Sequence, residues 1–202
     1  MKKIAGIDEV GRGPLAGPVT ICVVACDTKL YTKLKKDKHL PISGKDSKKL
    51  SQKDREKYAK YLKYIGVPYV IVNVSNKIID KTGISVAIRK AIKIGLEKIF
   101  PRTHLGRGDK YKILLDGGLK APKEFTTQKT IIKGDEKEKI IAWASILAKV
   151  SRDALMCRLA KKYPKYGFEI HKGYGTLSHR KAIKKYGLSD VHRKSFCKKY
   201  YK

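Results

Sequence analysis

Apolar residues gather in short runs along this chain, and their spacing divides it into strands and helices. An uninterrupted apolar run is typical of a strand buried on both faces, whereas apolar residues three or four positions apart are typical of a helix that buries one side. The runs predict strands at residues 3–10, 17–26, 68–74, 111–116 and 127–133. The helical spacing, with capping residues at its ends, predicts helices at residues 51–65, 84–99, 136–162 and 179–187.

The order of these elements predicts an α/β fold. Strands come first and then alternate with helices, which is the pattern of a mixed sheet with helices packed beside it. Residues 27–50 are polar and rich in lysine, and we expect them to form a loop. A chain of 202 residues can bury one sizeable core but hardly two. We therefore expect one domain over residues 1–202, with a helical portion from about 136 to 202 that completes a groove beside the sheet.

The charge balance adds a candidate partner. The chain has 48 Lys and Arg residues against 18 Asp and Glu, a formal net charge of +30. A lysine-rich surface on an ordinary soluble protein is one explanation. The other is a nucleic-acid partner, because Lys and Arg neutralise phosphates and release their counterions. We favour nucleic acid over heparin-like chains or anionic membranes.

No segment of the sequence indicates a targeting signal or a membrane span. The basic start at residues 1–3 is followed by charged residues where a signal peptide needs an apolar core. The apolar stretch at residues 13–26 is broken by proline and glycine and is shorter than the roughly 20 residues that a bilayer requires. The four cysteines form no CxxC pair. We expect a reduced, cytoplasmic protein that does not bind a membrane.

Two adjacent carboxylates, Asp8 and Glu9, end the first predicted strand and are followed by Gly11, Arg12 and Gly13. Adjacent side chains of a regular strand point to opposite faces, so both acids can reach one site only where the strand ends or bends. A divalent cation is the commonest reason to place two repelling carboxylates together. Two ordinary solvated acids at a strand end are the alternative.

Two further acids follow later strands. Asp116 comes after an apolar run and before two glycines, where open α/β sheets keep their ligands, although an Asp that starts a turn has the same pattern. Asp135 lies between a strand and a helix, where an N-cap is the favoured interpretation of the residue alone. In combination, carboxylates at strand ends suit two divalent cations, which prefer oxygen ligands and can clamp an in-line displacement at phosphorus.

Other residues fit a nucleic-acid ligand less specifically. Lys45, Ser47 and Lys48 offer two cations and a hydroxyl to backbone phosphates, and a solvated loop is the equal alternative. Tyr174 stands between glycines, so its ring is either free to stack on a base or ribose or a turn aromatic. The five histidines show no metal-ligand spacing. An acid–base histidine pair, as in a metal-free ribonuclease, stays open beside structural roles.

Taken together, these motifs resemble those of bacterial ribonuclease HII, the type 2 ribonuclease H family. The matching segments follow one another over nearly the whole chain, at residues 6–19, 45–51, 115–117, 133–135, 144–153, 172–176 and 192–196. The resemblance implies a ribonuclease-H-like mixed β-sheet flanked by helices, with a C-terminal helical extension. The single domain is then a catalytic domain.

The resemblance also implies roles for individual residues. The implied metal ligands, for two Mn²⁺ or Mg²⁺ ions, are Asp8, Glu9, Asp116 and Asp135. The residues implied to sense the 2′-hydroxyl and the RNA–DNA junction are Gly11, Arg12, Gly13 and Tyr174. The implied substrates are RNA–DNA hybrids and duplex DNA with an embedded ribonucleotide, cut to leave 3′-hydroxyl and 5′-phosphate ends. We expect a monomer with no obligatory protein partner.

The chain departs from the family pattern in three places. Trp143 stands in an Ala-rich helix where small residues are usual, and Asp116 is followed by Gly-Gly rather than Gly-Asn. The tail at residues 197–202 shows no clear clamp-binding motif. The acidic pair begins at residue 8, so we expect the extra N-terminal domain of the type 3 enzymes to be absent. These departures bear on partner binding rather than on the chemistry.

Overall fold

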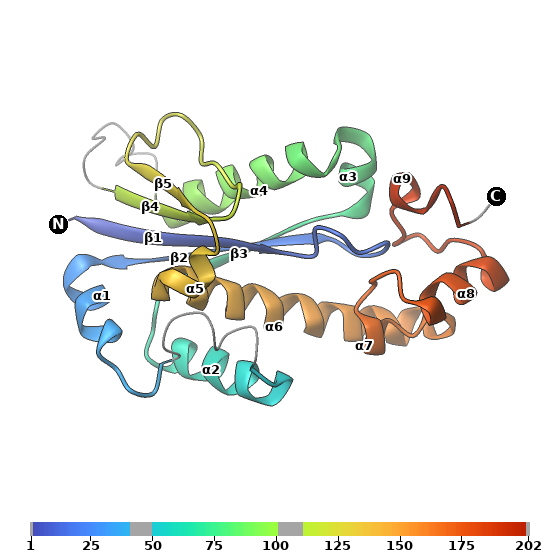
Figure 1. Ribbon diagram of the computed structural model, residues 1–202, viewed down its shortest axis with the longest axis horizontal. Helices are drawn as coiled ribbons and strands as arrows, with labels where there is room; N and C mark the ends of the chain where they lie inside the picture. The colour runs from blue at the N-terminus through green and yellow to red at the C-terminus, as the bar shows by residue number, and fades with distance from the viewer. Residues whose placement is uncertain (1, 41–49, 101–110, 201–202) are drawn as a thin grey trace.

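The computed structural model describes residues 2–40, 50–100 and 111–200. At its centre five strands form a sheet in the order β3-β2-β1-β4-β5 (Figure 1). The strands are β1 Lys3–Val10, β2 Val19–Asp27, β3 Tyr69–Val74, β4 Tyr111–Asp116 and β5 Gln128–Ile131. β2 runs antiparallel to β1 and β3, whereas β4 runs parallel to β1 and β5. The predicted mixed sheet is therefore confirmed.

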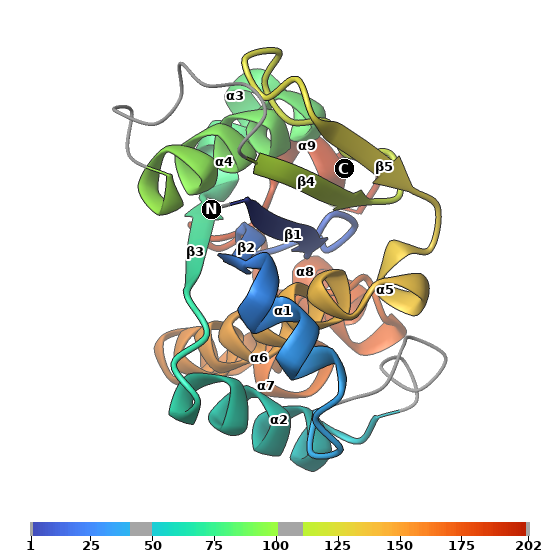
Figure 2. The ribbon, with the colours of Figure 1, turned by 90° about the vertical axis from the view of Figure 1, so that its left-hand side faces the viewer.

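Helices cover both faces of this sheet (Figures 1 and 2). One face carries α3 Asn76–Thr82 and α4 Ile84–Ile99. The other carries α6 Lys139–Lys162, with α2 Gln52–Tyr64 packed against its far side. α1 Thr28–Lys35 contacts β1 and β2 at one end of the sheet. Beyond the sheet the chain forms a 3-10 helix Pro164–Tyr166 and the helices α7 Phe168–His171, α8 Leu177–Tyr186 and α9 Lys194–Cys197.

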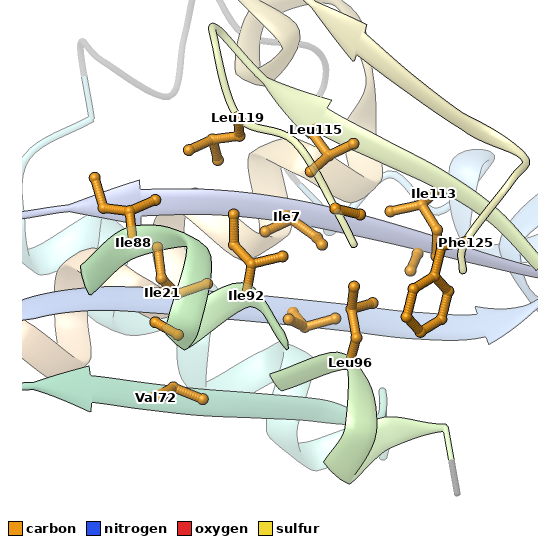
Figure 3. Packing of buried hydrophobic residues seen from close by; sticks show 14 of the residues in the cluster. Ile7, Ile21, Val72, Ile88, Ile92, Leu96, Ile113, Leu115, Leu119 and Phe125 are labelled. Atoms are coloured by element: carbon orange, nitrogen blue, oxygen red, sulfur yellow. The ribbon is translucent and has the colours of Figure 1, made fainter. Parts of the chain in front are cut away.

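The two faces of the sheet bury separate apolar clusters, because side chains alternate along each strand. Ile7 of β1 faces α4 and belongs to one cluster with Ile92 and Leu96 (Figure 3). Ile4 faces the other way, into the cluster around α6. The same alternation places Asp8 on the α6 face of the sheet.

Helix α6 approaches β1 more closely than a side chain at Gly6 would allow. A Cβ atom at this position would lie 2.4 Å from the carbonyl oxygen of Ile140, in the first turn of the helix. Gly6 shares a face of β1 with Asp8. The contact that seats the start of α6 therefore also brings the helix alongside the acid.

The loop predicted at residues 27–50 is wrong in its first part, where α1 forms. The carboxylate of Asp27 accepts a hydrogen bond from the amide of Leu30 and caps the helix. Tyr31 and Leu34 are buried, and the Tyr31 ring meets Trp143 edge-on at a centroid distance of 5.8 Å. The bulky Trp143, which departs from the family pattern, is thus covered by α1 and fully buried.

The helix predicted at residues 136–162 is also wrong at its start. It is divided into α5 Gly134–Lys137 and α6, because Glu138 between them has an extended backbone with φ −124° and ψ 115°. The helices predicted at 51–65, 84–99 and 179–187 correspond to α2, α4 and α8. Among the described residues, no helix combines the length and the apolar character needed to cross a membrane.

We expect the Gly6→Ala substitution to destabilise the protein, since its methyl group would collide with the Ile140 carbonyl oxygen. Overpacking of this kind costs about 1–3 kcal/mol, which corresponds to a fall of roughly 3–10 °C in Tm for a chain of this size. Thermal unfolding followed by circular dichroism measures the change. Gly118→Ala is the control, because a Cβ there meets nothing within 4 Å. Equal Tm values for both variants would show that the close contact between α6 and β1 at Gly6 does not contribute to stability.

Candidate active site

The four acids identified from the sequence all line one open cavity of about 330 Å³. Asp8 and Glu9 come from the end of β1, Asp116 comes from the end of β4, and Asp135 comes from α5. Residues more than a hundred positions apart are therefore gathered at one edge of the sheet, where the parallel strands β1 and β4 end.

The end of β4 explains how two adjacent acids reach the same cavity. β1 remains paired with β2 as far as Val10, but its pairing with β4 stops at Ile7 opposite Leu115. After Asp116 the chain turns away at Gly117, which has a φ of +55°. The last part of β1 is therefore open on one side, and both carboxylates face that opening.

Asp116 and Asp135 are held together by the backbone of α5. A carboxylate oxygen of Asp116 accepts hydrogen bonds from the amides of Gly134 and Asp135. Lys133, with a φ of 54°, occupies the N-cap position, so the interpretation of Asp135 as the helix cap is wrong. Asp135 is instead the second residue of α5 and is 3% exposed.

The environment of the first two acids favours their neutral forms. Burial raises the pKa of the Asp8 carboxyl to about 8, and the charge of Asp116 adds to the effect. Burial likewise raises the pKa of Glu9 to about 7, although the Arg12 guanidinium 3.7 Å away opposes the shift. A buried carboxylate needs a compensating positive charge.

Divalent cations would supply that charge, and the donor set fits them. Carboxylate oxygens are the ligands that Mg²⁺ and Mn²⁺ prefer. Within residues 2–40, 50–100 and 111–200, however, no three His, Cys, Asp or Glu side chains stand close enough to hold a metal ion as they are.

Two cationic side chains that the sequence interpretation missed also line this cavity, Arg55 of α2 and Lys149 of α6. The Lys149 ammonium lies 3.0 Å from a carboxylate oxygen of Asp153, one turn further along α6, which fixes its direction. Ser145, also on α6, hydrogen-bonds Asp8. Ser145 and Lys149 lie in the family-like segment 144–153, which was a usable signal. Nothing in the sequence around Arg55 indicated its position.

The residues expected to contact the substrate divide into three groups. Gly11, Arg12 and Gly13 directly follow β1, and Arg12 reaches back to Glu9. Tyr174 does not line the carboxylate cavity; its ring is 41% exposed and lies 5.9 Å from the guanidinium carbon of Arg152. The third group, Lys45, Ser47 and Lys48, lies outside the described residues.

Three histidines that are distant in the sequence form a buried cluster, which the spacing did not indicate. Nε2 atoms of His179 and His192 are 3.0 Å apart, and the ring of His171 stacks on His179. His179 and His192 are 0% and 1% exposed. Both rings are buried, so this pair packs inside the C-terminal part of the chain.

Comparison with known proteins now identifies the family. The family model described as Ribonuclease HII matches residues 5–199. The chain belongs to the ribonuclease HII family. The ribonuclease HII of Clostridium beijerinckii is 44% identical over 196 residues, which are 97% of this chain and 68% of that relative. As a member, the chain is a metal-dependent endonuclease of the ribonuclease H class.

Solved structures of ribonuclease HII relatives share the fold. The ribonuclease H2 from Pyrococcus horikoshii has a TM-score of 0.74 and 29% identity, over 98% of this chain and 96% of that one. The ribonuclease HII of Archaeoglobus fulgidus, solved in complex with PCNA, has a TM-score of 0.73 and 25% identity, over 94% of this chain and 91% of that one. The expected ribonuclease-H-like sheet with flanking helices is confirmed.

We expect Mn²⁺ to raise the Tm of this protein, because cations would relieve the repulsion in the carboxylate cavity. A ligand at about 100 times its Kd stabilises by about 2.7 kcal/mol, which is roughly 5–10 °C here. Differential scanning fluorimetry with and without Mn²⁺ measures the shift, and Asp8→Asn should reduce it by at least half. Glu169→Gln, an exposed acid of α7, is the control. The same Mn²⁺ shift in Asp8→Asn as in the wild type would place the cation elsewhere.

Proposed function

We propose that the protein cleaves the RNA strand of RNA–DNA hybrids and incises duplex DNA 5′ to an embedded ribonucleotide. The observation that carries the proposal is the cavity in which Asp8, Glu9, Asp116 and Asp135 converge, on a chain of the ribonuclease HII family. Two divalent cations bound there would activate a water molecule and stabilise the leaving oxygen. The products would carry 3′-hydroxyl and 5′-phosphate ends.

The chain's own residues divide the work between holding cations and holding the substrate. The four carboxylates would ligate the cations, and Ser145 keeps Asp8 oriented through its hydrogen bond. Lys149 and Arg55 stand at the same cavity and would attract the phosphate that is cut. Because Asp153 fixes Lys149, this positive charge is in place before the substrate arrives.

Selection of RNA over DNA requires contact with the 2′-hydroxyl. At Gly13 a Cβ would meet nothing within 4 Å, so a ribose could approach the backbone there without interference from a side chain. Gly11 instead lies against Arg152, which leaves no room for a side chain. A site built to pair with this hydroxyl rejects deoxyribose strongly, since its own polar groups would be left unpaired. Tyr174 would pack on the deoxyribose that follows the junction. No base edge needs to be read, so cleavage would be largely independent of sequence.

We further propose that the chain works as a single catalytic domain and as a monomer without an obligatory protein partner. Helices α7, α8 and α9 then extend the substrate groove beyond the sheet. Cleavage by the purified chain alone, at the mass of one copy in size-exclusion chromatography with light scattering, tests this.

The decisive experiment is cleavage of a labelled DNA duplex that contains one ribonucleotide. We expect wild-type protein to cut it with Mn²⁺ or Mg²⁺ and not with excess chelator. Asp8→Asn should lose about 1000-fold in rate, since losing a cation removes several kcal/mol of transition-state stabilisation. Its affinity for the duplex should be kept, and Glu169→Gln should cut like the wild type.

Two results would contradict this function and point to different alternatives. Cyclic-phosphate products that form in the presence of chelator would indicate a histidine-based, metal-independent ribonuclease. Duplex binding without any cleavage by the wild type would indicate a nucleic-acid-binding protein with no catalytic role.

Tyr174 should matter most where RNA meets DNA. Misplacing a substrate by about 1 Å can cost on the order of 100-fold in rate. We expect Tyr174→Ala to lose about that much on a single embedded ribonucleotide and less on continuous hybrid, with the Mn²⁺-induced Tm shift unchanged. Tyr174→Phe tells whether the hydroxyl or the ring is needed. Tyr186→Ala is the control, because its ring is similarly exposed, at 43% against 41%. Equal losses on both substrates would reduce Tyr174 to a packing residue.

A further inference from the structure

The turn from β1 to β2 is held from inside by two guanidinium groups, those of Arg152 and Arg193, both 0% exposed. The three donor nitrogens of Arg193 contact the carbonyl oxygens of Gly11 at 2.6 Å, Arg12 at 2.8 Å and Gly17 at 3.0 Å. Those of Arg152 contact the carbonyl oxygens of Ala16, Pro18 and Lys172. Every one of these bonds ends on backbone, so the guanidiniums set the path of the chain.

Burying two cationic guanidinium groups next to each other costs free energy. This cost indicates that Arg152 and Arg193 do more than fill space in the core. Burial, together with the nearby charge of Arg152, lowers the pKa of Arg193 to about 9. In the part of the chain that the structure describes, no carboxylate lies within salt-bridge distance of either guanidinium. Burying a charge without a paired ion is unfavourable unless its hydrogen bonds are satisfied. The backbone carbonyls provide that satisfaction, and the turn becomes rigid as a consequence.

The rigid turn has a defined outer side. The peptide bonds are trans, so each carbonyl and the N–H that follows it point in opposite directions. The carbonyls of Gly11 and Arg12 point inward to Arg193, so the amides of Arg12 and Gly13 point outward. Neither amide donates to another residue of the described chain. A Cβ on Gly13 would meet nothing within 4 Å, so the outer side is open, whereas Gly11 lies directly on Arg152.

Arg152 connects this turn to the second element proposed to contact the substrate. Its guanidinium donates to the carbonyl of Lys172, two residues before Tyr174, and lies beneath the Tyr174 ring. The amide of Leu15 donates to the carbonyl of Gly173 in the same region. The turn and the tyrosine are therefore parts of one rigid unit.

We propose that Arg193 is a positioning residue for ribonucleotide recognition, which turns the carbonyls of Gly11 and Arg12 inward so that the amides of Arg12 and Gly13 face the 2′-hydroxyl. This inference rests on the proposed function. A lysine cannot replace the arginine, because a single ammonium lacks the planar fork that holds three carbonyls at once. Arg193 itself does not touch the substrate.

The test compares binding and cleavage in matched variants. In an Asp8→Asn background, which prevents cutting, affinity is measured for a duplex with one ribonucleotide and for the same duplex in all-DNA form. We expect Arg193→Lys to remove most of the preference for the ribonucleotide while leaving the affinity for DNA unchanged. With Asp8 restored, kcat on the single ribonucleotide should fall about 100-fold with little change in KM. Arg158→Lys, an exposed arginine of α6, should change neither quantity.

A merely structural role would lower affinity for both duplexes together and would leave their ratio intact, and that outcome overturns the inference. If Arg193→Lys does not fold, the ¹⁵N resonances of Arg12 and Gly13 in the Asp8→Asn protein decide. They should shift with the ribonucleotide duplex and not with DNA, and no difference would overturn the proposal. Failure of the wild type to cut would instead defeat the proposed function, independently of Arg193.

Discussion

The close contact between Gly6 and the first turn of α6 is the constraint on which the rest of the site depends. From there β1 and α6 run alongside each other, and their residues meet in order: Gly6 with Ile140, Asp8 with Ser145 and Gly11 with Arg152. Five residues of strand cover about 17 Å, and the twelve residues of helix from 140 to 152 cover about 18 Å. The matching lengths let one helix support the acids, the cavity and the turn in sequence.

Because α6 runs alongside β1, residues spaced three or four positions apart on α6 all face the site. Ser145, Lys149, Arg152 and Met156 are three or four positions apart and share the side of the helix that follows β1. Ser145 contacts Asp8, and Lys149 lines the cavity. Arg152 lies against Gly11 of the turn, and Met156 lies against Gly17. Displacing the start of α6 would shift all of these contacts together. The positions of the site residues on α6 are therefore fixed by the packing of α6 against the sheet.

The charge distribution places a group of four carboxylates within a chain that is strongly positive as a whole. A net charge of +30 favours a polyanionic partner, yet four carboxylates gather in the cavity where we propose that the phosphate is cut. Burial raises the pKa of Asp8 and Glu9, so cations bound in the cavity would have to stabilise the ionised carboxylates that ligate them. The buried Arg152 and Arg193 differ from the cations of the cavity, because their guanidinium groups donate to backbone carbonyl oxygens. They shape the turn, whereas Lys149 and Arg55 line the cavity, where we propose that they attract the phosphate.

The sequence by itself determined the strands, most of the long helices and the candidate acids Asp8, Glu9 and Asp116, since apolar runs, caps and short motifs are local properties. Asp135 alone was interpreted as a helix cap and became a candidate only through the family resemblance. The sequence also located Gly11–Gly13 and Tyr174 as residues of interest. It missed α1 and the break at Glu138, because the burial of Tyr31 against Trp143 and the turn that brings Asp135 to Asp116 depend on distant partners. Only the tertiary structure placed Arg55 at the cavity, gathered the histidines and buried the two arginines under the turn. Those arrangements depend on contacts between segments that are far apart in the chain, and local sequence patterns do not specify such contacts.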